Sequence, residues 1–197
     1  MTASVQFYFD FRSPYSYLAS TQLESLGAEI TLKPIQVLKL MEQVGNVPTS
    51  ITCRPKGIYA QVDMGRWVRR YGLSLNPSNI RLTDGDACSR AVLSAATSEQ
   101  ALAVTHALYH AIWAGAKTLE NTADVLAALG EAGIDTAEIA QRIDSAEIIA
   151  ALSQNTAEAA ARGAFGVPTV YVGDAMFFGN DRLDFVRDEI SRQQEAS

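Results

Sequence analysis

The chain has 197 residues, which is enough for one domain with a large insertion or for two small domains. Its formal net charge of -6 and its pI near 4.9 argue against a nucleic-acid partner, because nucleic-acid binding normally needs a basic face. No run approaches the roughly 20 apolar residues that span a membrane, and residues 1–4 lack the basic start of a signal peptide. We therefore expect a cytoplasmic protein with no membrane or nucleic-acid partner.

The N-terminal region is predicted to form a βαβ unit. Residues 5–11 are rich in aromatic residues and valine, which favours a strand. Residues 14–26 follow as a helix, with Ser13 as its N-cap and Pro14 at its first position. Residues 29–34 alternate polar and apolar side chains, so we expect a second strand. A short helical crossover makes the two strands parallel.

The middle of the chain is predicted to be all-helical, and the end returns to β structure. Helices are expected at 38–47 and 57–71, a loop at 46–50, a turn at 76–79, and several helices between 86 and 161. After these come strands at 167–172 and 175–178, joined by a Gly173-Asp174 turn, and a helix at 182–193. The order predicts the α/β class: a thioredoxin-like domain of residues 1–37 and 163–197, with an all-helical domain of residues 38–162 inserted.

The segment Ser13-Pro14-Tyr15-Ser16 lies where a thioredoxin-type redox protein carries Cys-x-x-Cys. Serine forms no disulfide, so a disulfide oxidoreductase is disfavoured. A hydroxyl at the start of a helix, where free N–H groups and the helix dipole favour an anion, suits the thiolate of another molecule. Taken alone, the motif is explained more simply by an N-cap role for Ser13.

Three further motifs have both an ordinary and a ligand-binding interpretation. Pro168 suits the start of a strand, but a cis bond before it would leave backbone groups free to pair with an extended peptide. Asn180 and Asp181 either cap a helix or hold the two charges of a γ-glutamyl group. Lys56 either is a solvated surface charge or neutralises an acidic substrate.

The cysteines and histidines give no sign of a metal site. Cys53 and Cys88 form neither a CxxC nor a metal-ligand spacing, so free thiols in a reducing cytosol are the simplest interpretation. His106 and His110 are four residues apart in a helical pattern, but no H-E-x-x-H motif surrounds them. Packing or surface roles are favoured for both histidines.

Five ordered parts of the chain resemble the 2-hydroxychromene-2-carboxylate isomerases, relatives of kappa-class glutathione transferases in the thioredoxin-like disulfide oxidase superfamily. They are Phe7–Leu18, Gly45–Pro48, Arg54–Gly57, Asp63–Trp67 with Tyr71–Leu73, and Phe165–Thr169 with Phe178–Leu183. The resemblance covers essentially the whole chain and departs at Val47-Pro48-Thr49, where a second proline is expected. It implies a thioredoxin-like fold with a helical insertion, a homodimer, and a bacterial glutathione-dependent enzyme of aromatic hydrocarbon (naphthalene-type) catabolism.

The same resemblance implies roles for individual residues. Ser13 would be the catalytic residue, with its hydroxyl bonded to the sulfur of glutathione. The residues implied to bind this cofactor are Asn46, Lys56, Val167, Pro168, Asn180, Asp181 and Arg182. Tyr15 and Tyr59, with Lys56 again, would contact the aromatic carboxylate substrate.

The implied reaction is the glutathione-dependent cis–trans isomerisation of 2-hydroxychromene-2-carboxylate to trans-o-hydroxybenzylidenepyruvate. The glutathione thiolate would add to the substrate, allow bond rotation and leave again. Two alternatives stay open at this point. One is a kappa-like glutathione transferase that conjugates small electrophiles, and the other is a redox-inactive thioredoxin-like protein that binds peptides beside Pro168.

Overall fold

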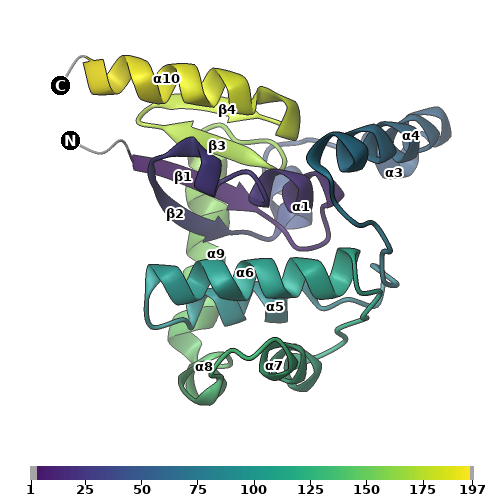
Figure 1. Cartoon of the computed structure of the whole chain (residues 1–197), viewed down its shortest axis with the longest axis vertical. Helices are drawn as coiled ribbons and strands as arrows, with labels where there is room; N and C mark the ends of the chain where they lie inside the picture. Colours follow the sequence, from purple (N-terminus) through teal and green to yellow (C-terminus); the bar gives the residue numbers. More distant parts are fainter. Residues whose placement is uncertain (1–3, 196–197) are drawn as a thin grey trace.

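The computed structural model describes residues 4–195, and its centre is a four-stranded mixed sheet with helices packed on both faces (Figure 1). The strand order is β2 (Glu29–Pro34), β1 (Ser4–Phe9), β3 (Thr169–Val172) and β4 (Ala175–Phe178). β1 runs parallel to β2 and antiparallel to β3, and β4 pairs antiparallel with β3. The predicted βαβ unit and the C-terminal hairpin are both confirmed.

The first helix confirms the predicted cap but is shorter than predicted. α1 spans Pro14–Ser20, and the Ser13 side chain accepts a hydrogen bond from the Ser16 N–H. The helix ends six residues before the predicted boundary at residue 26, because the hydroxyls of Ser20 and Thr21 turn back to carbonyls three residues earlier. A short 3₁₀ helix, η1 (Glu24–Leu26), completes the crossover.

The middle of the chain is helical, as predicted. Its helices are α2 (Val37–Gln43), α3 (Thr49–Thr52), α4 (Arg54–Tyr71), α5 (Gly85–Leu93), α6 (Ser98–Trp113), α7 (Thr122–Glu131), α8 (Ala137–Arg142) and α9 (Ala146–Ala161). The chain ends with the 3₁₀ helix η2 (Asn180–Arg182) and α10 (Leu183–Glu195). In Figure 1, α5 to α8 lie below the sheet, α10 lies along β4, and α3 and α4 project to one side.

Several other predicted boundaries and turns were wrong, among them the end of the helix predicted at 38–47, which is Gln43. β1 ends at Phe9 rather than residue 11, because Asp10 leaves the sheet and its carboxylate accepts the N–H of Val37. The predicted loop at 46–50 contains the start of α3, and α4 begins at Arg54, with proline in its first turn. Residues 76–79 form no turn, because they run beside the end of α6, where Asn76 donates its N–H to the Trp113 carbonyl over 2.7 Å.

The side chains on the two faces of β1 belong to different apolar clusters. Phe7 and Phe9 point into the larger cluster, which also contains Tyr109 and Trp113 of α6. Tyr8 points the other way and packs near Tyr171 against α9. Each fully buried side chain of this size contributes roughly 1.5–3 kcal/mol by leaving water. The larger cluster joins the sheet to the helices below it, and this fixes the loop after β1 in place.

The helices also bear on whether the chain crosses a membrane, whereas the predicted domain division is not tested by them. Within residues 4–195, no helix combines the length and the apolar content needed to cross a membrane. The division between residues 1–37 with 163–197 and residues 38–162 stays a prediction.

Candidate active site

Ser13 lies at the end of the β1–α1 loop. Its hydroxyl oxygen accepts one hydrogen bond, and its hydroxyl proton is free to be donated. Its N–H donates to the Asp10 carbonyl over 3.0 Å, and its Oγ accepts the Ser16 N–H over 3.2 Å. Within the described chain, the Ser13 hydroxyl proton is donated to no protein group. Because the N-cap bond uses only an oxygen lone pair, the O–H remains available to a ligand beside this half-buried residue.

A buried ionic network holds the loop that carries Ser13. Asp10 is 1% exposed, and its carboxylate accepts bonds from the Arg12 N–H, from Arg12 Nε and Nη2, and from the Val37 N–H, all between 2.9 and 3.1 Å. Arg12 Nη2 also lies 3.6 Å from Asp86 on α5. These carboxylates raise the pKa of Arg12 against the opposing effect of burial. The network ties the Ser13 loop to the starts of α2 and α5.

Tyr15 connects α1 to α4 above this loop. Its hydroxyl lies 3.1 Å from Asp63 Oδ2, to which it donates a hydrogen bond. Burial, followed by the negative charge of Asp63, raises the pKa of Tyr15, and Asp181 also acts on it. The phenol therefore stays a neutral donor, and α1, α4 and η2 meet around it. Tyr59, on the same helix as Asp63, is 62% exposed.

The segment before β3 forms a second wall of the site. The Val167–Pro168 peptide bond is cis, as the ligand-binding interpretation of Pro168 requires. Asn46 donates its amide N–H to the Phe165 carbonyl over 2.6 Å, which places the loop after α2 against this segment. Lys56 stays on the surface, where its ammonium makes a long contact of 3.4 Å to Thr49 Oγ1.

Asn180 is the exceptional residue of the C-terminal part. Its side chain is 2% exposed, and neither its amide nitrogen nor its amide oxygen has a partner within the described residues. Buried polar groups are nearly always hydrogen-bonded, so this amide is a candidate partner for a bound ligand or an ordered water. It lines a cavity of about 200 Å³, whose other members are Gln22, Trp67, Arg70, Tyr71, Asp181, Leu183, Asp184 and Arg187.

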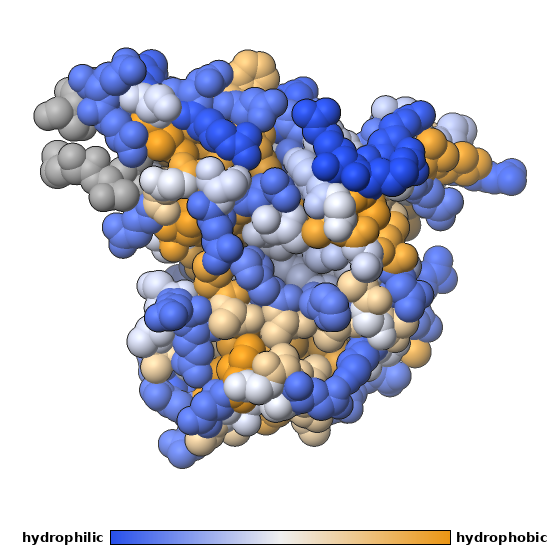
Figure 2. All heavy atoms as spheres, viewed as in Figure 1, coloured by the Kyte–Doolittle hydropathy of each residue, from blue (hydrophilic) through white to orange (hydrophobic). Residues whose placement is uncertain are grey.

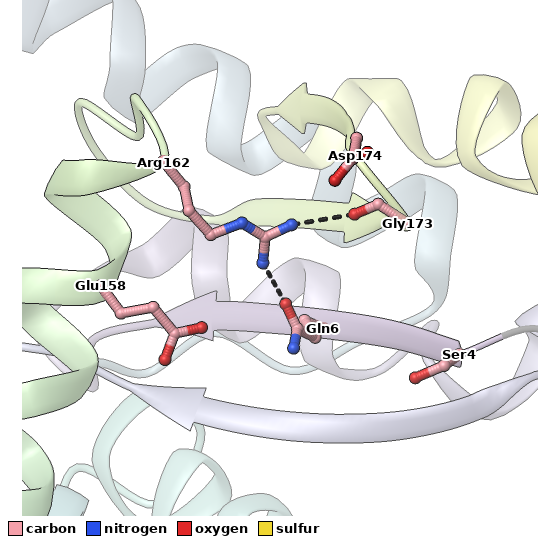
Figure 3. A pocket seen from close by; sticks show the side chains of 6 residues that line it. All are labelled: Ser4, Gln6, Glu158, Arg162, Gly173 and Asp174. Atoms are coloured by element: carbon pink, nitrogen blue, oxygen red, sulfur yellow. Dashed lines mark hydrogen bonds between the residues drawn. The ribbon is translucent and has the colours of Figure 1, made fainter.

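A larger cavity of about 450 Å³ lies elsewhere, between β1, α9 and the β3–β4 turn (Figure 3). Figure 3 shows Glu158 of α9 and Arg162, directly after α9, reaching over the strands from one side, with Asp174 at the hairpin turn. None of the residues assigned to the site from sequence lines this cavity.

The structure brings together only some of the residues assigned from sequence. Tyr15 and Asp181 come close around the junction of α1, α4 and η2, and Asn46 contacts the segment before Pro168. Arg182 instead pairs with Asp181 over 2.7 Å and does not line the smaller cavity. The sequence analysis did not assign Arg70, Tyr71 and Arg187, because no spacing motif links the end of α4 to α10.

Of the two histidines and two cysteines, Cys88 alone is buried. His106 Nε2 lies 3.3 Å from the Ser20 carbonyl at the end of α1. Cys88 is fully buried, and burial raises the pKa of its thiol, so it stays protonated. Cys53 is partly exposed at the start of α4. Among residues 4–195, no group of three or more His, Cys, Asp and Glu side chains is placed to hold a metal ion.

Comparison with known proteins gives the family of this chain. Residues 4–191 match the family described as DSBA-like thioredoxin domain. The chain is 32% identical over 192 residues to the 2-hydroxychromene-2-carboxylate isomerase of Sphingobium xenophagum, covering 94% of this chain and 97% of that one. The chain belongs to the 2-hydroxychromene-2-carboxylate isomerase family.

A solved structure agrees with this assignment. The crystal structure of a 2-hydroxychromene-2-carboxylate isomerase matches with a TM-score of 0.86 and 30% identity, over 98% of each chain. A more distant relative of the isomerase family is glutathione S-transferase kappa 1 of Caenorhabditis elegans, which is 24% identical over 96% of this chain and 92% of that one. The thioredoxin-like fold, the isomerase family and the kappa-class relationship expected from the sequence are therefore confirmed.

Proposed function

We propose that this chain catalyses the glutathione-dependent isomerisation of 2-hydroxychromene-2-carboxylate to trans-o-hydroxybenzylidenepyruvate, in naphthalene-type aromatic catabolism in the cytoplasm. The observation that carries the proposal is the 32% identity to a 2-hydroxychromene-2-carboxylate isomerase over nearly the full length of both chains. Serine at position 13, where a redox relative would carry cysteine, agrees with a role in holding a thiol rather than exchanging a disulfide.

The polar groups of the site fit glutathione. Ser13 has a hydroxyl proton to donate, and Asn180 has an amide that is buried without a partner within the described chain. Ser13, Asn46, Lys56, Val167 and Pro168 would surround the cysteinyl part, with Asn180, Asp181 and Arg182 at the γ-glutamyl end. Bound glutathione would supply the thiolate nucleophile of the reaction.

The protein's own groups would do three things. The Ser13 O–H would donate to the sulfur and stabilise its negative form, which favours ionisation of the thiol near neutral pH. Tyr15, whose raised pKa keeps it neutral, and Tyr59 would line the apolar path of the aromatic ring. Lys56 is held only by the long contact to Thr49, so its ammonium is free to meet the substrate carboxylate.

A homodimer is part of the proposal, and the surface of α3 and α4 supports it. Four large apolar side chains are more than half exposed there: Ile51 at 72%, Tyr59 at 62%, Ile58 at 54% and Val62 at 52%. Figure 2 shows apolar surface on this projecting part of the molecule. Patches of this kind mark association surfaces. Light scattering of the purified protein at several concentrations measures the mass directly.

The second candidate is a kappa-like glutathione transferase, favoured by the 24% identity to the C. elegans enzyme. The two functions share the thiol site and differ in the fate of the cofactor. A transferase consumes glutathione stoichiometrically, whereas an isomerase leaves its concentration constant. A peptide-binding protein without catalysis offers no reason for the unpartnered Asn180 amide beside a small polar cavity.

The test follows 2-hydroxychromene-2-carboxylate by absorbance with and without glutathione, for the wild type and Ser13→Gly. Glycine is nearly as good an N-cap as serine, so this change removes the hydroxyl at a cost of only a few tenths of a kcal/mol. Turnover should depend on glutathione without consuming it, and should fall about 100-fold or more in the variant.

The control is Ser153→Ala, which removes an exposed hydroxyl that bonds only its own helix. It should leave turnover unchanged. Wild-type protein that binds glutathione but forms only a thioether product would replace the isomerase by the transferase. Full activity of Ser13→Gly would remove Ser13 from the mechanism.

A further inference from the structure

Two aromatic residues of α6 bond the β1–α1 loop that carries Ser13. The Tyr109 phenol donates to the Asp10 carbonyl over 3.1 Å, and the indole Nε1 of Trp113 donates to the Phe11 carbonyl over 2.9 Å. Tyr109 and Trp113 are four residues apart, so they lie on the same face of the helix. The helical part of the chain below the sheet in Figure 1 therefore holds two consecutive carbonyls shortly before Ser13.

Tyr109 reaches the Ser13 turn from two sides. Its hydroxyl donates to the carbonyl of Asp10, which also accepts the Ser13 N–H over 3.0 Å. The Ser16 Oγ is fully buried and forms no complete hydrogen bond within the described residues, but it lies close enough to the phenol to oppose part of the burial effect on its pKa. The N–H of Ser16 caps Ser13 Oγ over 3.2 Å. One buried hydroxyl is therefore next to both residues that fix the N–H and the Oγ of Ser13.

The hydroxyl of Tyr109 is not needed to fill space. Tyr109 is 1% exposed and lies among Phe9, Phe11 and Tyr17, whose ring centroids are between 4.6 and 6.0 Å from its own. Phenylalanine would fill the same apolar space without a hydroxyl that loses its water on burial. Burial and the charge of Asp10 raise the pKa of the phenol well above its usual value, so it stays a neutral donor. The contribution specific to tyrosine here is the bond to the loop.

The other titratable groups near the phenol keep one protonation state around neutral pH. Cys88 of α5 acts on the phenol, and burial raises the pKa of its thiol, so it stays protonated. The Asp10 carboxylate is paired with Arg12, whose second acidic neighbour is Asp86 of α5. A change in pH dependence caused by the Tyr109 hydroxyl would therefore report on the cofactor thiol at Ser13.

We propose that Tyr109 is a positioning residue, whose hydroxyl holds the Asp10 and Ser16 sides of the turn so that Ser13 directs its O–H at the thiol of the cofactor. The inference rests on the proposed glutathione-dependent function and gives the helical part of the chain a share in the thiol site. A donor that is aimed in advance stabilises a developing anion without reorganisation when the charge forms. Trp113 supports the same loop through the next carbonyl.

The test replaces Tyr109 by phenylalanine, which removes the hydroxyl and keeps the ring. The matched control is Tyr17→Phe, because the Tyr17 phenol lies in the same apolar cluster and donates to another backbone carbonyl, that of Ser74, over 3.0 Å. Both variants lose one bond of the same kind, so their urea midpoints should fall by similar amounts. A merely structural role for Tyr109 would make the two variants alike in every other measurement.

The expected difference between the two variants is in the ionisation of bound glutathione. With Ser13 misaligned, the thiolate loses part of its stabilisation, so the pKa of the bound thiol should rise toward the value of about 8.5 for a free thiol. Near neutral pH, kcat should fall about tenfold in Tyr109→Phe, which is the rate equivalent of one hydrogen bond. The loss should shrink at higher pH, where the thiolate forms without help from Ser13. Tyr17→Phe should match the wild type in kcat and in the pH profile.

A double variant tests whether Tyr109 acts through Ser13. Ser13→Gly has no hydroxyl to aim, so the addition of Tyr109→Phe should leave the pKa of the bound thiol unchanged, as measured by the ultraviolet absorbance of the thiolate. A further rise in that pKa would overturn the inference. A wild-type pH profile in Tyr109→Phe would overturn it as well, and so would an equal shift in Tyr17→Phe.

The outcomes separate this inference from the proposed function. Wild-type protein that binds glutathione but does not isomerise the chromene overturns the proposed isomerase, and the thiolate absorbance of the variants then decides the inference. Wild-type protein that binds no glutathione overturns both.

Discussion

The two cavities of this protein differ in volume and in whether their polar side chains are bonded to other protein groups. In the larger one, Arg162 donates to the Gly173 carbonyl over 2.8 Å and to Gln6, as Figure 3 shows, and its guanidinium lies 3.8 Å from the Tyr171 ring centroid. Its neighbour Glu158 accepts bonds from Tyr8 over 2.6 Å and from Lys33 over 3.0 Å. In the smaller one, Asn180 is buried with no such partner in the described chain.

The difference favours the smaller cavity over the larger one as the candidate ligand site. The guanidinium of Arg162 and the carboxylate of Glu158 are bonded to protein groups and so stabilise the fold, whereas the Asn180 amide has no such partner in the described chain. An unpartnered buried amide costs about 1–3 kcal/mol in the ligand-free protein. A cost of that kind is offset when a ligand binds, which is why the smaller cavity is the better candidate.

The largest expected effect on stability is at Arg12. Its bonds to the buried Asp10 are the strongest example of polar groups that the protein itself satisfies. Arg12→Met would leave the Asp10 carboxylate, only 1% exposed, without its charged partner. The free energy of unfolding should fall by about 3–5 kcal/mol, measured by urea denaturation. A loss below about 1 kcal/mol would mean that this network contributes little to stability. Bonded polar groups would then not be what distinguishes the rest of the protein from the smaller cavity.

Arg162→Met should have a smaller effect of the same sign. The change removes the bond to the Gly173 carbonyl and the stacking on Tyr171. Because Arg162 is partly exposed, the expected loss is about 1–2 kcal/mol in the same denaturation assay. Glutathione affinity by titration should not change, and a drop in it would give the larger cavity a role in binding.

Asn180→Leu should have the smallest effect on stability, with the opposite sign. Leucine is close in shape to asparagine and removes two unsatisfied polar atoms, so unfolding should become harder by about 1 kcal/mol. Glutathione affinity should fall at the same time. A destabilised variant with normal affinity would show that the amide is structural and would reverse the contrast between the cavities.

The order of elements was predictable because each carries a local signal. Alternating strands, the Ser13-Pro14 cap and the Gly173-Asp174 turn act over a few residues, and all three were confirmed. The predicted ends of elements were wrong where a hydrogen bond to a residue distant in the sequence overrides the local preference. The Val37 N–H draws Asp10 out of the sheet, and the end of α6 holds residues 76–79 extended.

The site was predictable in part for a similar reason. Ser13 and Asn180 lie in short motifs at the starts of helical segments, where sequence is informative. Arg70 and Arg187 are 117 positions apart and share a cavity only because the fold brings the end of α4 and part of α10 to the same place. The family resemblance assigned Arg182 to the site, and its side chain pairs with its own neighbour, Asp181.

The exposure of α4 affects how the site forms. This 18-residue helix contains no buried residue, yet it provides Trp67, Arg70 and Tyr71 to the cavity and Asp63 to Tyr15. A segment with so little burial detaches from the rest at lower free energy than β1 does, so its amide hydrogens should exchange faster with solvent. A ligand that contacts both α4 and α10 would slow hydrogen exchange in both helices together. Its apparent affinity would be lower than its intrinsic affinity, because part of the binding free energy keeps α4 docked.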